Sequence, residues 1–326
     1  MTSAVLCLRP RADFERAGAL PPPSLEVTYR GPGDADVSAL MKVARALVIP
    51  AVGPALSPAL FEGTALKLIQ VTGAGLDRLD RSTMQRLGLP VANVPGGSNR
   101  AVAEYAVTMA SMLLRRFVWA DAEIRRGNYS ASRARMIGDN LGGLDGLLVG
   151  VVGLGTIGLA VAEAFQHMGC RICFYDPAPT DPAAARALGA ESMSLDGLLK
   201  VADVVTLHVP LLPATRNLLG DREMALMKPG AVLIQASRGG TVDELALATH
   251  LRTGHLGGAA IDVYSLEPPE ADHALLALDG EAARRVLFTP HIAGVTRQSA
   301  AFLCRSAWRN VERVLIDGAA PLNRAY

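Results

Sequence analysis

The chain has 326 residues, and its 32 Lys and Arg residues nearly balance 31 Asp and Glu residues, which gives a formal net charge of +1. No basic or acidic block exceeds a few residues, so we expect neither nucleic acid nor a membrane surface as a partner. Half of the residues are hydrophobic but only 5% are aromatic. This length and composition favour two parallel α/β domains whose strands are covered on both faces.

The first part of the chain, up to about residue 95, alternates short apolar runs with helical patterns. Helical periodicity appears over residues 36–44 and 77–87. The pattern predicts a small open parallel sheet with strands at residues 4–8, 25–29, 46–49, 67–72 and 90–93. Because Arg9 and Pro10 stop the first apolar run, it is not typical of a signal peptide, and we expect a cytoplasmic protein.

The next segment is predicted to be mainly helical. A loop at residues 94–99 leads into a long helix from about Ala101, and a charged helical piece covers residues 117–127. An irregular stretch with three arginines overlaps its end and continues beyond it: Arg126, Arg133 and Arg135. The sequence leaves open whether this stretch is an exposed arm or a solvated loop.

Regular alternation of strands and helices returns from residue 147 to residue 288. It predicts the six strands of a dinucleotide-binding domain, at residues 149–152, 171–175, 203–207, 231–235, 259–263 and 286–288. An amphipathic helix then covers residues 296–316. If this helix packs back on the first sheet, residues 1–100 and 295–326 form a substrate-binding domain. Residues 101–294 then form a nucleotide-binding domain, with a ligand cleft between the two.

The most specific motif is G-x-G-x-x-G at residues 153–158, directly after an apolar run. Gly153 would allow a tight turn, Gly155 would let the backbone approach a pyrophosphate, and Gly158 would let the following helix pack closely. The motif therefore predicts a dinucleotide site, and a glycine-rich turn without a ligand is the structural alternative.

The residues around these glycines specify the cofactor further. Thr156 and Ile157 would begin the following helix, whose N-terminus attracts phosphate groups. Asp176 ends the next apolar run, where its carboxylate could accept hydrogen bonds from a ribose. Since the same carboxylate would repel a 2′-phosphate, the sequence predicts NAD rather than NADP as the cofactor.

Two other features have competing interpretations. Residues 146–162 are apolar enough to suggest a membrane span, but their glycines and the strand–turn–helix pattern argue against one. Cys170 and Cys173 have the CxxC spacing of redox or zinc motifs. Because no second Cys/His pair lies nearby, burial inside the fold is favoured.

Three side chains that could carry hydride-transfer chemistry follow predicted strands, where open α/β sheets place ligands. Arg238 offers a planar guanidinium to a carboxylate, although a solvated loop arginine would fit this segment equally well. His291 can give and take a proton near neutral pH. Glu267 would stabilise the charged imidazole if it lay beside His291.

These candidates lie in a series of ordered motifs. They are V-G-L-G-T-I-G at residues 152–158, L-H-V-P-L at 207–211, S-R-G-G-T-V-D-E at 237–244, I-D-V-Y at 261–264, E-P at 267–268 and T-P-H-I-A-G at 289–294. Together with Asp176 they resemble the D-isomer-specific 2-hydroxyacid dehydrogenase family over nearly the whole chain. The resemblance implies an α/β fold of two doubly wound parallel sheets, with a Rossmann-type nucleotide domain inserted in a flavodoxin-like substrate domain. It also implies a homodimer.

The resemblance further implies NAD(H)-dependent interconversion of a small-molecule 2-oxo acid and a D-2-hydroxy acid. Arg238, Glu267 and His291 would be the catalytic set. Arg238 and His291 would also bind the substrate, together with the loop Gly73, Ala74 and Gly75, whose backbone N–H groups could hold an anion.

Besides the glycine motif and Asp176, the resemblance implies a larger set of cofactor-binding residues. They are His208, Val209, Pro210, Thr215, Ala236, Ser237, Arg238, Asp262, His291 and Gly294.

The sequence departs from the family pattern at several places. Gln235 stands where the family commonly has asparagine, which we expect to alter only supporting hydrogen bonds. Residues 50–53 lack an Arg-Thr pair, which weakens the case for a phosphate-bearing substrate, and Glu267 argues against formate oxidation. An NAD-sensing regulatory protein on the same fold is the alternative function. A phosphite dehydrogenase is disfavoured because residues 73–75 contain no lysine.

Overall fold

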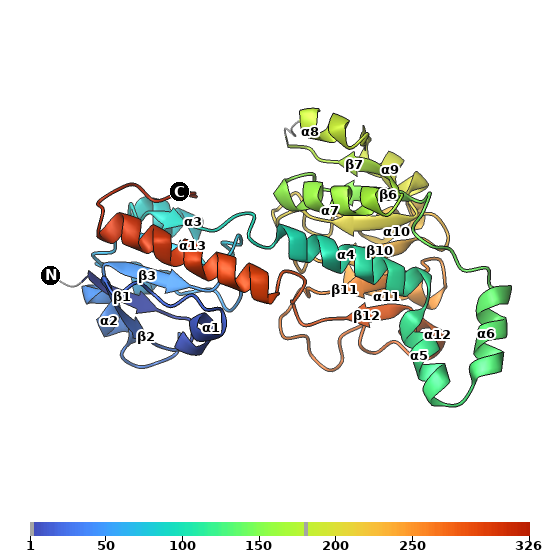
Figure 1. The fold of residues 1–326 in the computed structure, drawn as a ribbon, viewed down its shortest axis with the longest axis horizontal. Coiled ribbons are helices and arrows are strands. Elements are labelled where there is room, and N and C mark those ends of the chain that lie inside the picture. Colours follow the sequence, from blue (N-terminus) through green and yellow to red (C-terminus); the bar gives the residue numbers. More distant parts are fainter. Residues whose placement is uncertain (1–2, 179–181) are drawn as a thin grey trace. The chain divides into compact units, whose positions relative to one another are not determined.

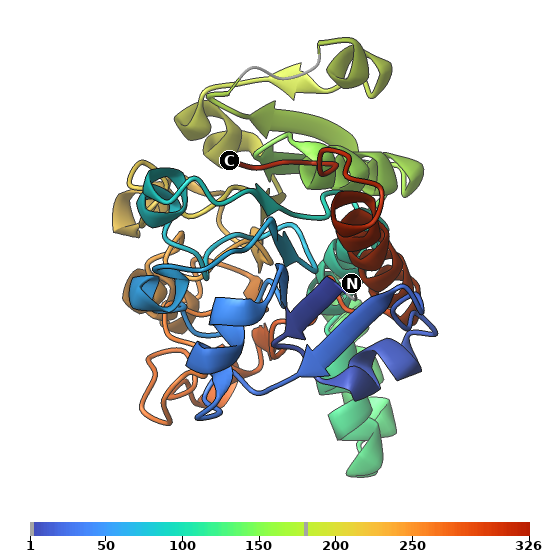
Figure 2. The same ribbon diagram turned by 90° about the vertical axis from the view of Figure 1, so that its left-hand side faces the viewer.

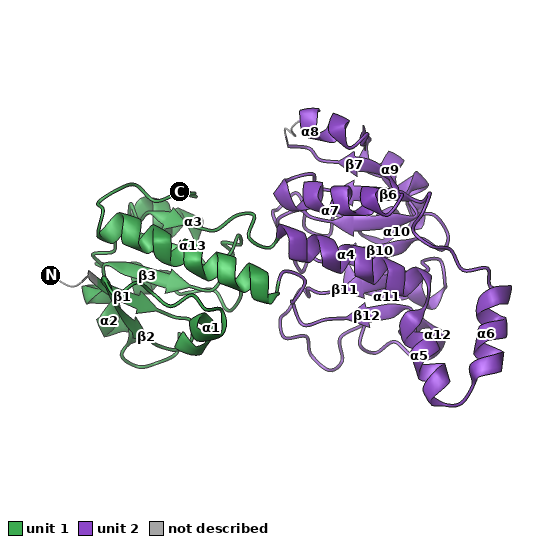
Figure 3. Cartoon of the chain, viewed as in Figure 1, with its two compact units in different colours: residues 1–98, 295–326 green, residues 99–294 purple. Residues whose placement is uncertain are grey.

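The computed structural model describes residues 3–178 and 182–326. The chain divides into two compact units, which Figure 3 distinguishes by colour. Unit 1 consists of Met1–Ser98 and Val295–Tyr326, and unit 2 consists of Asn99–Gly294. Each unit is built on one parallel β-sheet.

Unit 1 has a five-stranded sheet in the order β2-β1-β3-β4-β5, which is the flavodoxin-like order. The strands are β1 (Ser3–Cys7), β2 (Leu25–Tyr29), β3 (Ala46–Ile49), β4 (Leu68–Val71) and β5 (Val91–Ala92). The helices are α1 (Arg11–Arg16), α2 (Val37–Val43), the 3-10 helix η1 (Pro58–Phe61), α3 (Arg81–Arg86) and α13 (Arg297–Leu315). The predicted open parallel sheet is thus confirmed.

Helix α13 joins the C-terminal end of the chain to the sheet of unit 1 (Figure 2). Its apolar stripe buries Trp308 and Val311 in a cluster that also contains strand residues. The Trp308 ring lies 4.9 Å from the ring of Phe14, centroid to centroid. Asn310 is buried as well, and its Nδ2 donates a 2.6 Å hydrogen bond to Oε1 of Gln70 on β4. Apolar packing and one buried polar pair therefore fix α13 on its sheet.

Unit 2 has a seven-stranded sheet in the order β12-β11-β10-β9-β6-β7-β8, which contains the Rossmann order. The strands are β6 (Leu148–Val152), β7 (Arg171–Tyr175), β8 (Glu191–Ser192), β9 (Val204–Leu207), β10 (Val232–Gln235), β11 (Gly258–Ile261) and β12 (Val286–Phe288). The order reverses between β6 and β9, and ligands of open α/β sheets bind beyond the carboxyl ends of strands at such a point.

The helices of unit 2 cover its sheet through two apolar clusters (Figure 1). They are α4 (Asn99–Leu114), α5 (Phe117–Arg125), α6 (Tyr129–Gly138), α7 (Thr156–His167), α8 (Pro182–Ala187), α9 (Leu195–Val201), α10 (Asp221–Leu226), α11 (Glu244–Arg252) and α12 (Gly280–Ala283). One cluster includes Ala106, Val161 and Phe165 from α4 and α7, and the other includes Leu198 and Leu247 from α9 and α11.

Three of the differences from the sequence predictions have a clear physical cause. The arginine-containing stretch forms helix α6, whose single buried residue is Ser132. Because α6 packs no apolar stripe into a core, it lacks the periodicity that reveals a helix. Strand β8 was missed because it has two residues, both exposed. Helix α3 begins at Arg81 rather than near residue 77, since the Asp80 side chain caps it by accepting from the Thr83 N–H.

The structure also bears on the two competing interpretations from the sequence. Residues 148–167 form β6, a turn and α7, and no described helix is long and apolar enough to cross a membrane. Cys170 and Cys173 are buried thiols, and burial raises the pKa of each to about 11. Within residues 3–178 and 182–326, no group of three His, Cys, Asp or Glu residues is placed to hold a metal ion.

Candidate active site

The three candidate catalytic residues follow three neighbouring strands of the unit 2 sheet. Arg238 comes after β10, Glu267 after β11 and His291 after β12. Since these strands are parallel and adjacent, their carboxyl ends share one edge of the sheet. The topology therefore gathers the three turns, as the sequence predicted.

His291 and Glu267 form a direct pair. Nδ1 of the imidazole lies 2.8 Å from Oε2 of the carboxylate, and both side chains are partly exposed, at 24% and 30%. The other carboxylate oxygen accepts a 3.1 Å hydrogen bond from the Tyr264 N–H, which fixes the orientation of Glu267. With Nδ1 committed to the carboxylate, Nε2 is the ring nitrogen placed to exchange a proton with a substrate.

A buried carboxylate shapes the turn that carries His291. Asp262 is 1% exposed, and its oxygens accept hydrogen bonds from Oγ1 of Thr289 at 2.5 Å and from the N–H groups of Ile292 and Ala293 at 2.8 Å each. Its backbone carbonyl accepts from the His291 N–H at 2.8 Å. His291 itself has a φ of 55°, a left-handed conformation that costs a residue other than glycine about 1–3 kcal/mol. Asp262 therefore acts here as a positioning residue for His291.

The network beneath His291 extends to two tyrosines. The hydroxyl of Tyr105 on α4 lies 2.8 Å from Oγ1 of Thr289, and the Tyr264 hydroxyl donates to the Thr289 carbonyl at 3.0 Å. Burial raises the pKa of Tyr105 above its ordinary value, so its hydroxyl stays protonated and can donate to Thr289. Sequence reasoning missed this support, although Thr289 begins the motif at residues 289–294.

The turn that carries Arg238 is closed by Gln235. This side chain is 2% exposed, and its Nε2 donates to the Arg238 carbonyl at 2.9 Å and to Oγ1 of Thr241 at 2.6 Å. Its Oε1 accepts from Oγ of Ser237 at 2.8 Å. A Cβ on Gly239 would lie 1.7 Å from the Tyr264 carbonyl oxygen, so this turn packs tightly against the segment that leads to Glu267.

The glycine motif connects β6 to α7 as the sequence predicted. Gly153 has a φ of +92°, and a Cβ on Gly158 would lie 2.0 Å from the Gly153 carbonyl oxygen. In contrast, a Cβ on Gly155 would meet nothing within 4 Å. Gly155 is also the N-cap of α7, so the N–H groups of Thr156 and Ile157 have no acceptor within the helix, and they donate no hydrogen bond among the described residues. This geometry suits a phosphate group.

Asp176 follows β7 and is held beside the glycine loop. Its Oδ2 accepts a 2.8 Å hydrogen bond from the Leu154 N–H, and its Oδ1 accepts a 2.9 Å bond from the Ala178 N–H. Each carboxylate oxygen keeps a second lone pair. The fixed carboxylate can therefore accept from ribose hydroxyls.

Two buried polar atoms beside this loop have no hydrogen-bond partner within the described part of the chain. They are Nδ1 of His208 and Oδ1 of Asn99. Asn99 donates to the Thr156 carbonyl at 3.0 Å, and a Cβ on Gly153 would lie 2.7 Å from the His208 carbonyl oxygen, so both residues adjoin the glycine loop. Since buried polar groups are normally paired, these two atoms fit a polar ligand such as a dinucleotide.

Burial also determines the charge of His208. It lowers the pKa of this residue from 6.5 to about 3, while Nε2 lies 2.8 Å from Oγ1 of Thr206. His208 is therefore neutral at physiological pH. Asn99 and Thr206 were not singled out from the sequence. Thr206 lies on the same strand face as residue 208, and this period-two spacing could have revealed it.

The remaining predicted cofactor residues lie in the same unit. Thr215 closes its own loop, because Oγ1 donates to the Pro210 carbonyl at 2.6 Å and accepts from the Leu212 N–H at 2.7 Å. Val209 packs close to Gly153. Ala236 and Ser237 belong to the turn after β10, and Gly294 ends unit 2.

In unit 1 the loop Gly73, Ala74 and Gly75 follows β4. The Gly73 carbonyl accepts from the Val94 N–H at 2.9 Å, and the Ala74 carbonyl accepts from Nδ2 of Asn93 at 2.7 Å. Within the described residues, the N–H groups of Ala74 and Gly75 donate no hydrogen bond. Two such donors in one loop are suited to an anion.

A buried arginine anchors the neighbouring loop of unit 1. Arg78 is 3% exposed, and it donates to the Pro54 carbonyl through Nε at 2.9 Å and to the Pro50 carbonyl through Nη1 at 3.3 Å. Burial lowers its pKa below the ordinary value for arginine, though not enough to remove the charge at neutral pH. A Cβ on Gly73 would lie 2.7 Å from the Cβ of Ala51, so the two loops are in contact.

Comparison with known proteins identifies the family to which the chain belongs. Residues 107–293 match the model of the D-isomer specific 2-hydroxyacid dehydrogenase, NAD binding domain. The chain belongs to this family. It is 37% identical over 250 residues to the (S)-sulfolactate dehydrogenase of Chromohalobacter salexigens, covering 76% of each chain. It is 36% identical over 234 residues to the D-3-phosphoglycerate dehydrogenase of Archaeoglobus fulgidus, covering 72% of this chain and 42% of that protein.

The chain thus spans less than half the length of that phosphoglycerate dehydrogenase relative. Solved structures of similar length share the fold of the present chain. The TT0316 protein of Thermus thermophilus superposes with a TM-score of 0.81 at 30% identity, covering 99% of this chain and 100% of that one. The apo D-lactate dehydrogenase of Escherichia coli superposes with a TM-score of 0.78 at 26% identity, covering 99% of both. The predicted family, fold class and NAD cofactor are confirmed.

The depressed pKa of His208 predicts a pH-dependent stability. Because the folded-state pKa of about 3 is below the ordinary value of 6.5, the unfolded state protonates first as the pH falls. The free energy of unfolding should therefore decrease below pH 6.5, with a contribution of up to about 1.4 kcal/mol per pH unit from this residue. Urea unfolding of the cofactor-free protein between about pH 7 and about pH 5 measures this slope. His208→Gln should make it shallower, and an unchanged slope would refute the assignment.

Proposed function

We propose that this chain catalyses the NAD(H)-dependent interconversion of a 2-oxo acid and a D-2-hydroxy acid. The observation that carries the proposal is the 2.8 Å pair of His291 and Glu267, on the same sheet edge as the turn of Arg238. The names of the relatives agree with this class of reaction, since they include sulfolactate and lactate dehydrogenases. A bound nicotinamide would supply or accept the hydride.

His291 would move the proton of the reaction. In the reductive direction its imidazolium donates a proton from Nε2 to the keto oxygen, and in the oxidative direction the neutral ring takes the proton back. Glu267 stabilises the imidazolium and fixes the ring by holding Nδ1. General acid–base catalysis of this kind is worth about 10²–10⁴ in rate.

Arg238 would bind the substrate's carboxylate and polarise its keto group. A guanidinium presents a rigid fork of N–H donors that matches a carboxylate and keeps its charge at every working pH. The N–H groups of Ala74 and Gly75, which donate no hydrogen bond within the described residues, support binding of an anion by this loop. The substrate-binding role of unit 1 is part of this proposal.

The first experiment measures loss of NADH absorbance with a panel of 2-oxo acids that contains glyoxylate, hydroxypyruvate, pyruvate and larger homologues. At least one should be reduced, and His291→Ala should lower kcat by about 10²–10⁴ with NADH affinity nearly intact. The matched control is His167→Ala, on the exposed end of α7. Tight NADH binding without turnover of any member would instead favour an NAD-sensing regulatory protein.

Arg238→Lys tests whether Arg238 binds the substrate's carboxylate. An ammonium is a point charge that cannot reproduce the bidentate fork, so kcat/KM should fall by about 10²–10³. Arg252→Lys, an exposed substitution at the end of α11, serves as the control and should leave kcat/KM unchanged. Near-normal kcat/KM in Arg238→Lys would remove Arg238 from the proposed mechanism.

We also propose that the protein is a homodimer and that α5 and α6 contribute to its interface. These two helices expose several large apolar side chains: Phe117, Val118, Ile124, Tyr129 and Ile137. Helix α5 buries none of its residues within this chain. Contiguous exposed apolar surface marks interaction sites, and twofold dimers are the commonest oligomers.

The dimer is tested by light scattering coupled to size exclusion. The wild-type protein should have twice the chain mass, and Ile124→Glu combined with Ile137→Glu should shift it toward the monomer. Leu245→Glu, at an even more exposed apolar position on α11, is the control. A wild-type monomer would contradict the proposal.

A cytoplasmic location is also proposed, in keeping with the four free thiols, and cell fractionation would test it.

A further inference from the structure

The anion-binding loop of unit 1, which consists of Gly73, Ala74 and Gly75, follows a strand with a neighbour on each side. That strand is β4, and it pairs with β3 and with β5. Residues 50–56 follow β3, and Asn93 follows β5. Because the three strands are parallel, both flanking segments reach the same edge of the sheet as the loop.

Both carbonyl groups that precede the two donor N–H groups are held by the segment after β5. The Gly73 carbonyl accepts from the Val94 N–H at 2.9 Å, and the Ala74 carbonyl accepts from Nδ2 of Asn93 at 2.7 Å. Both peptides are trans, so each C=O and the N–H that follows it point in opposite directions. The N–H groups of Ala74 and Gly75 therefore both point away from the donors that hold the carbonyls.

The bond from Asn93 acts where the backbone itself selects no orientation. A flip of the Ala74–Gly75 peptide changes ψ of Ala74 and φ of Gly75, and glycine adopts positive and negative φ with similar ease. The bond from Asn93 opposes such a flip, because the flipped peptide would turn its N–H toward the Nδ2 donor. The direction of the Gly75 N–H thus depends on this one side chain.

The backbone at Asn93 is fixed in turn by the C-terminal tail. The Asn93 N–H donates to the Asn323 carbonyl at 3.3 Å. The Val91 N–H donates to the Tyr326 carbonyl at 3.0 Å, and the Ala325 N–H donates to the Val91 carbonyl at 2.8 Å. Although β5 has only two residues, it is therefore paired on one side with β4 and on the other with the tail.

Arg78 holds the segment on the β3 side of the loop. Its guanidinium donates to the carbonyls of Pro50 and Pro54, and no acid among the described residues pairs with it. Ala51 lies next to Pro50 in this segment and contacts Gly73 of the anion-binding loop. The buried cation thus fastens the segment that packs against the start of the loop.

We propose that Asn93 and Arg78 are positioning residues for the binding of the substrate's carboxylate. Asn93 turns the N–H of Gly75 toward the anion, and Arg78 keeps residues 50–54 packed against Gly73. These roles rest on the proposed function, in which this loop binds the carboxylate. The anion is bound in the ground state and in the transition state alike, so loss of either side chain should raise KM and leave kcat nearly unchanged.

Asn93→Ala tests the role of Asn93, because it removes the Nδ2 donor without adding a charge. KM for the 2-oxo acid with the highest kcat/KM should rise at least about tenfold, as expected for the loss of one hydrogen bond to a charged group. The dissociation constant of oxamate, a non-reacting analogue of a 2-oxo acid, should rise by a similar factor in the NADH complex. Thr64→Ala is the matched control and should change neither constant, since Thr64 donates to the Phe61 carbonyl at 3.0 Å but precedes β4.

Arg78→Lys tests the role of Arg78. An ammonium cannot reproduce the planar fork that holds two carbonyls, so KM and the oxamate dissociation constant should again rise while kcat changes little. Arg86→Lys, at an exposed position of α3, is the control. Thermal unfolding shows whether each variant folds, and Asn93→Ala tests the orientation of the loop even if the buried Arg78→Lys variant does not.

Unchanged KM and oxamate affinity in Asn93→Ala, or a loss confined to kcat, would overturn the role of Asn93. The same results in a folded Arg78→Lys variant would overturn the role of Arg78. A wild-type protein that reduces no 2-oxo acid and binds no oxamate would instead contradict the proposed function. The residual dipolar coupling of the Gly75 N–H reports its direction without any turnover. This coupling should change in Asn93→Ala but not in Thr64→Ala, and an unchanged value in Asn93→Ala would contradict the orienting role.

Discussion

The catalytic edge of unit 2 depends on the buried carboxylate of Asp262. Three donors from the next segment of chain converge on its side chain, and a fourth reaches its carbonyl. Hydrogen bonds to a charged group contribute about 1.5–3 kcal/mol each, so the three bonds together exceed the about 1–3 kcal/mol that the left-handed backbone of His291 costs. The burial of a negative charge is compensated by the same bonds. One side chain thus both secures its own burial and imposes the conformation that presents the imidazole.

The two histidines of this edge have opposite electrostatic settings. His291 is partly exposed, and its Nδ1 contacts the Glu267 carboxylate. His208 has no acidic partner among the described residues, and desolvation lowers its pKa to about 3. One ring is therefore oriented by a carboxylate, while the other offers a neutral hydrogen-bonding nitrogen beside the glycine loop. The two surroundings differ because His208 follows β9 and His291 follows β12.

Much of the fold could be predicted from the sequence, because strands buried on both faces appear as continuous apolar runs. Strands β2, β3, β7 and β12 were placed residue for residue. Helix α6 could not be placed, since a helix with one buried residue has no apolar periodicity. The glycine motif and the three catalytic candidates were recognisable because each follows a strand, and parallel strands end at a common edge.

The supporting residues of the site could not be predicted in the same way. Asn99 reaches Thr156 across 57 positions, and Thr289 reaches Asp262 across 27. No spacing rule joins such partners, because their proximity is created by the crossovers of the sheet. Gln235 was noticed only as a departure from a family pattern, and its amide proved to join both sides of the Arg238 turn. Long-range polar contacts of this kind become visible only once the topology is known.

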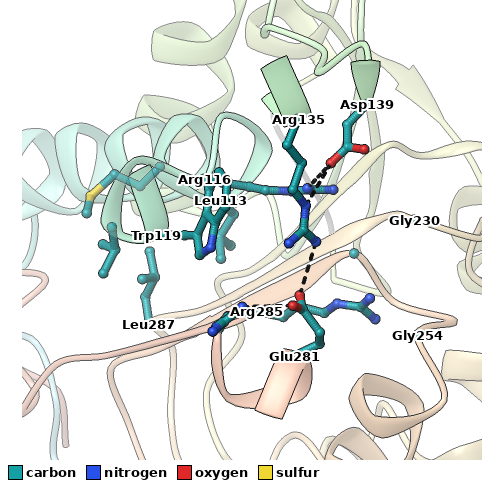
Figure 4. Close-up of a pocket in the computed structure, with 14 residues that line it drawn as sticks. Leu113, Arg116, Trp119, Arg135, Asp139, Gly230, Gly254, Glu281, Arg285 and Leu287 are labelled. Atoms are coloured by element: carbon teal, nitrogen blue, oxygen red, sulfur yellow. Dashed lines mark hydrogen bonds and ion pairs between the residues drawn. The ribbon is translucent and has the colours of Figure 1, made fainter. Parts of the chain in front are cut away.

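The amino edge of the same sheet, where Arg285 precedes β12 (Figure 4), shows how a charge can be retained without being neutralised. Arg285 lies against the Leu251 carbonyl, in the last turn of α11, where the helix dipole presents partial negative charge. That contact stabilises a cation by a fraction of a unit charge, whereas an acid would cancel it. The guanidinium is therefore stabilised in place without an acidic partner among the described residues. A parallel sheet gathers the starts of its strands as regularly as their ends, so both edges can assemble charged groups from distant segments.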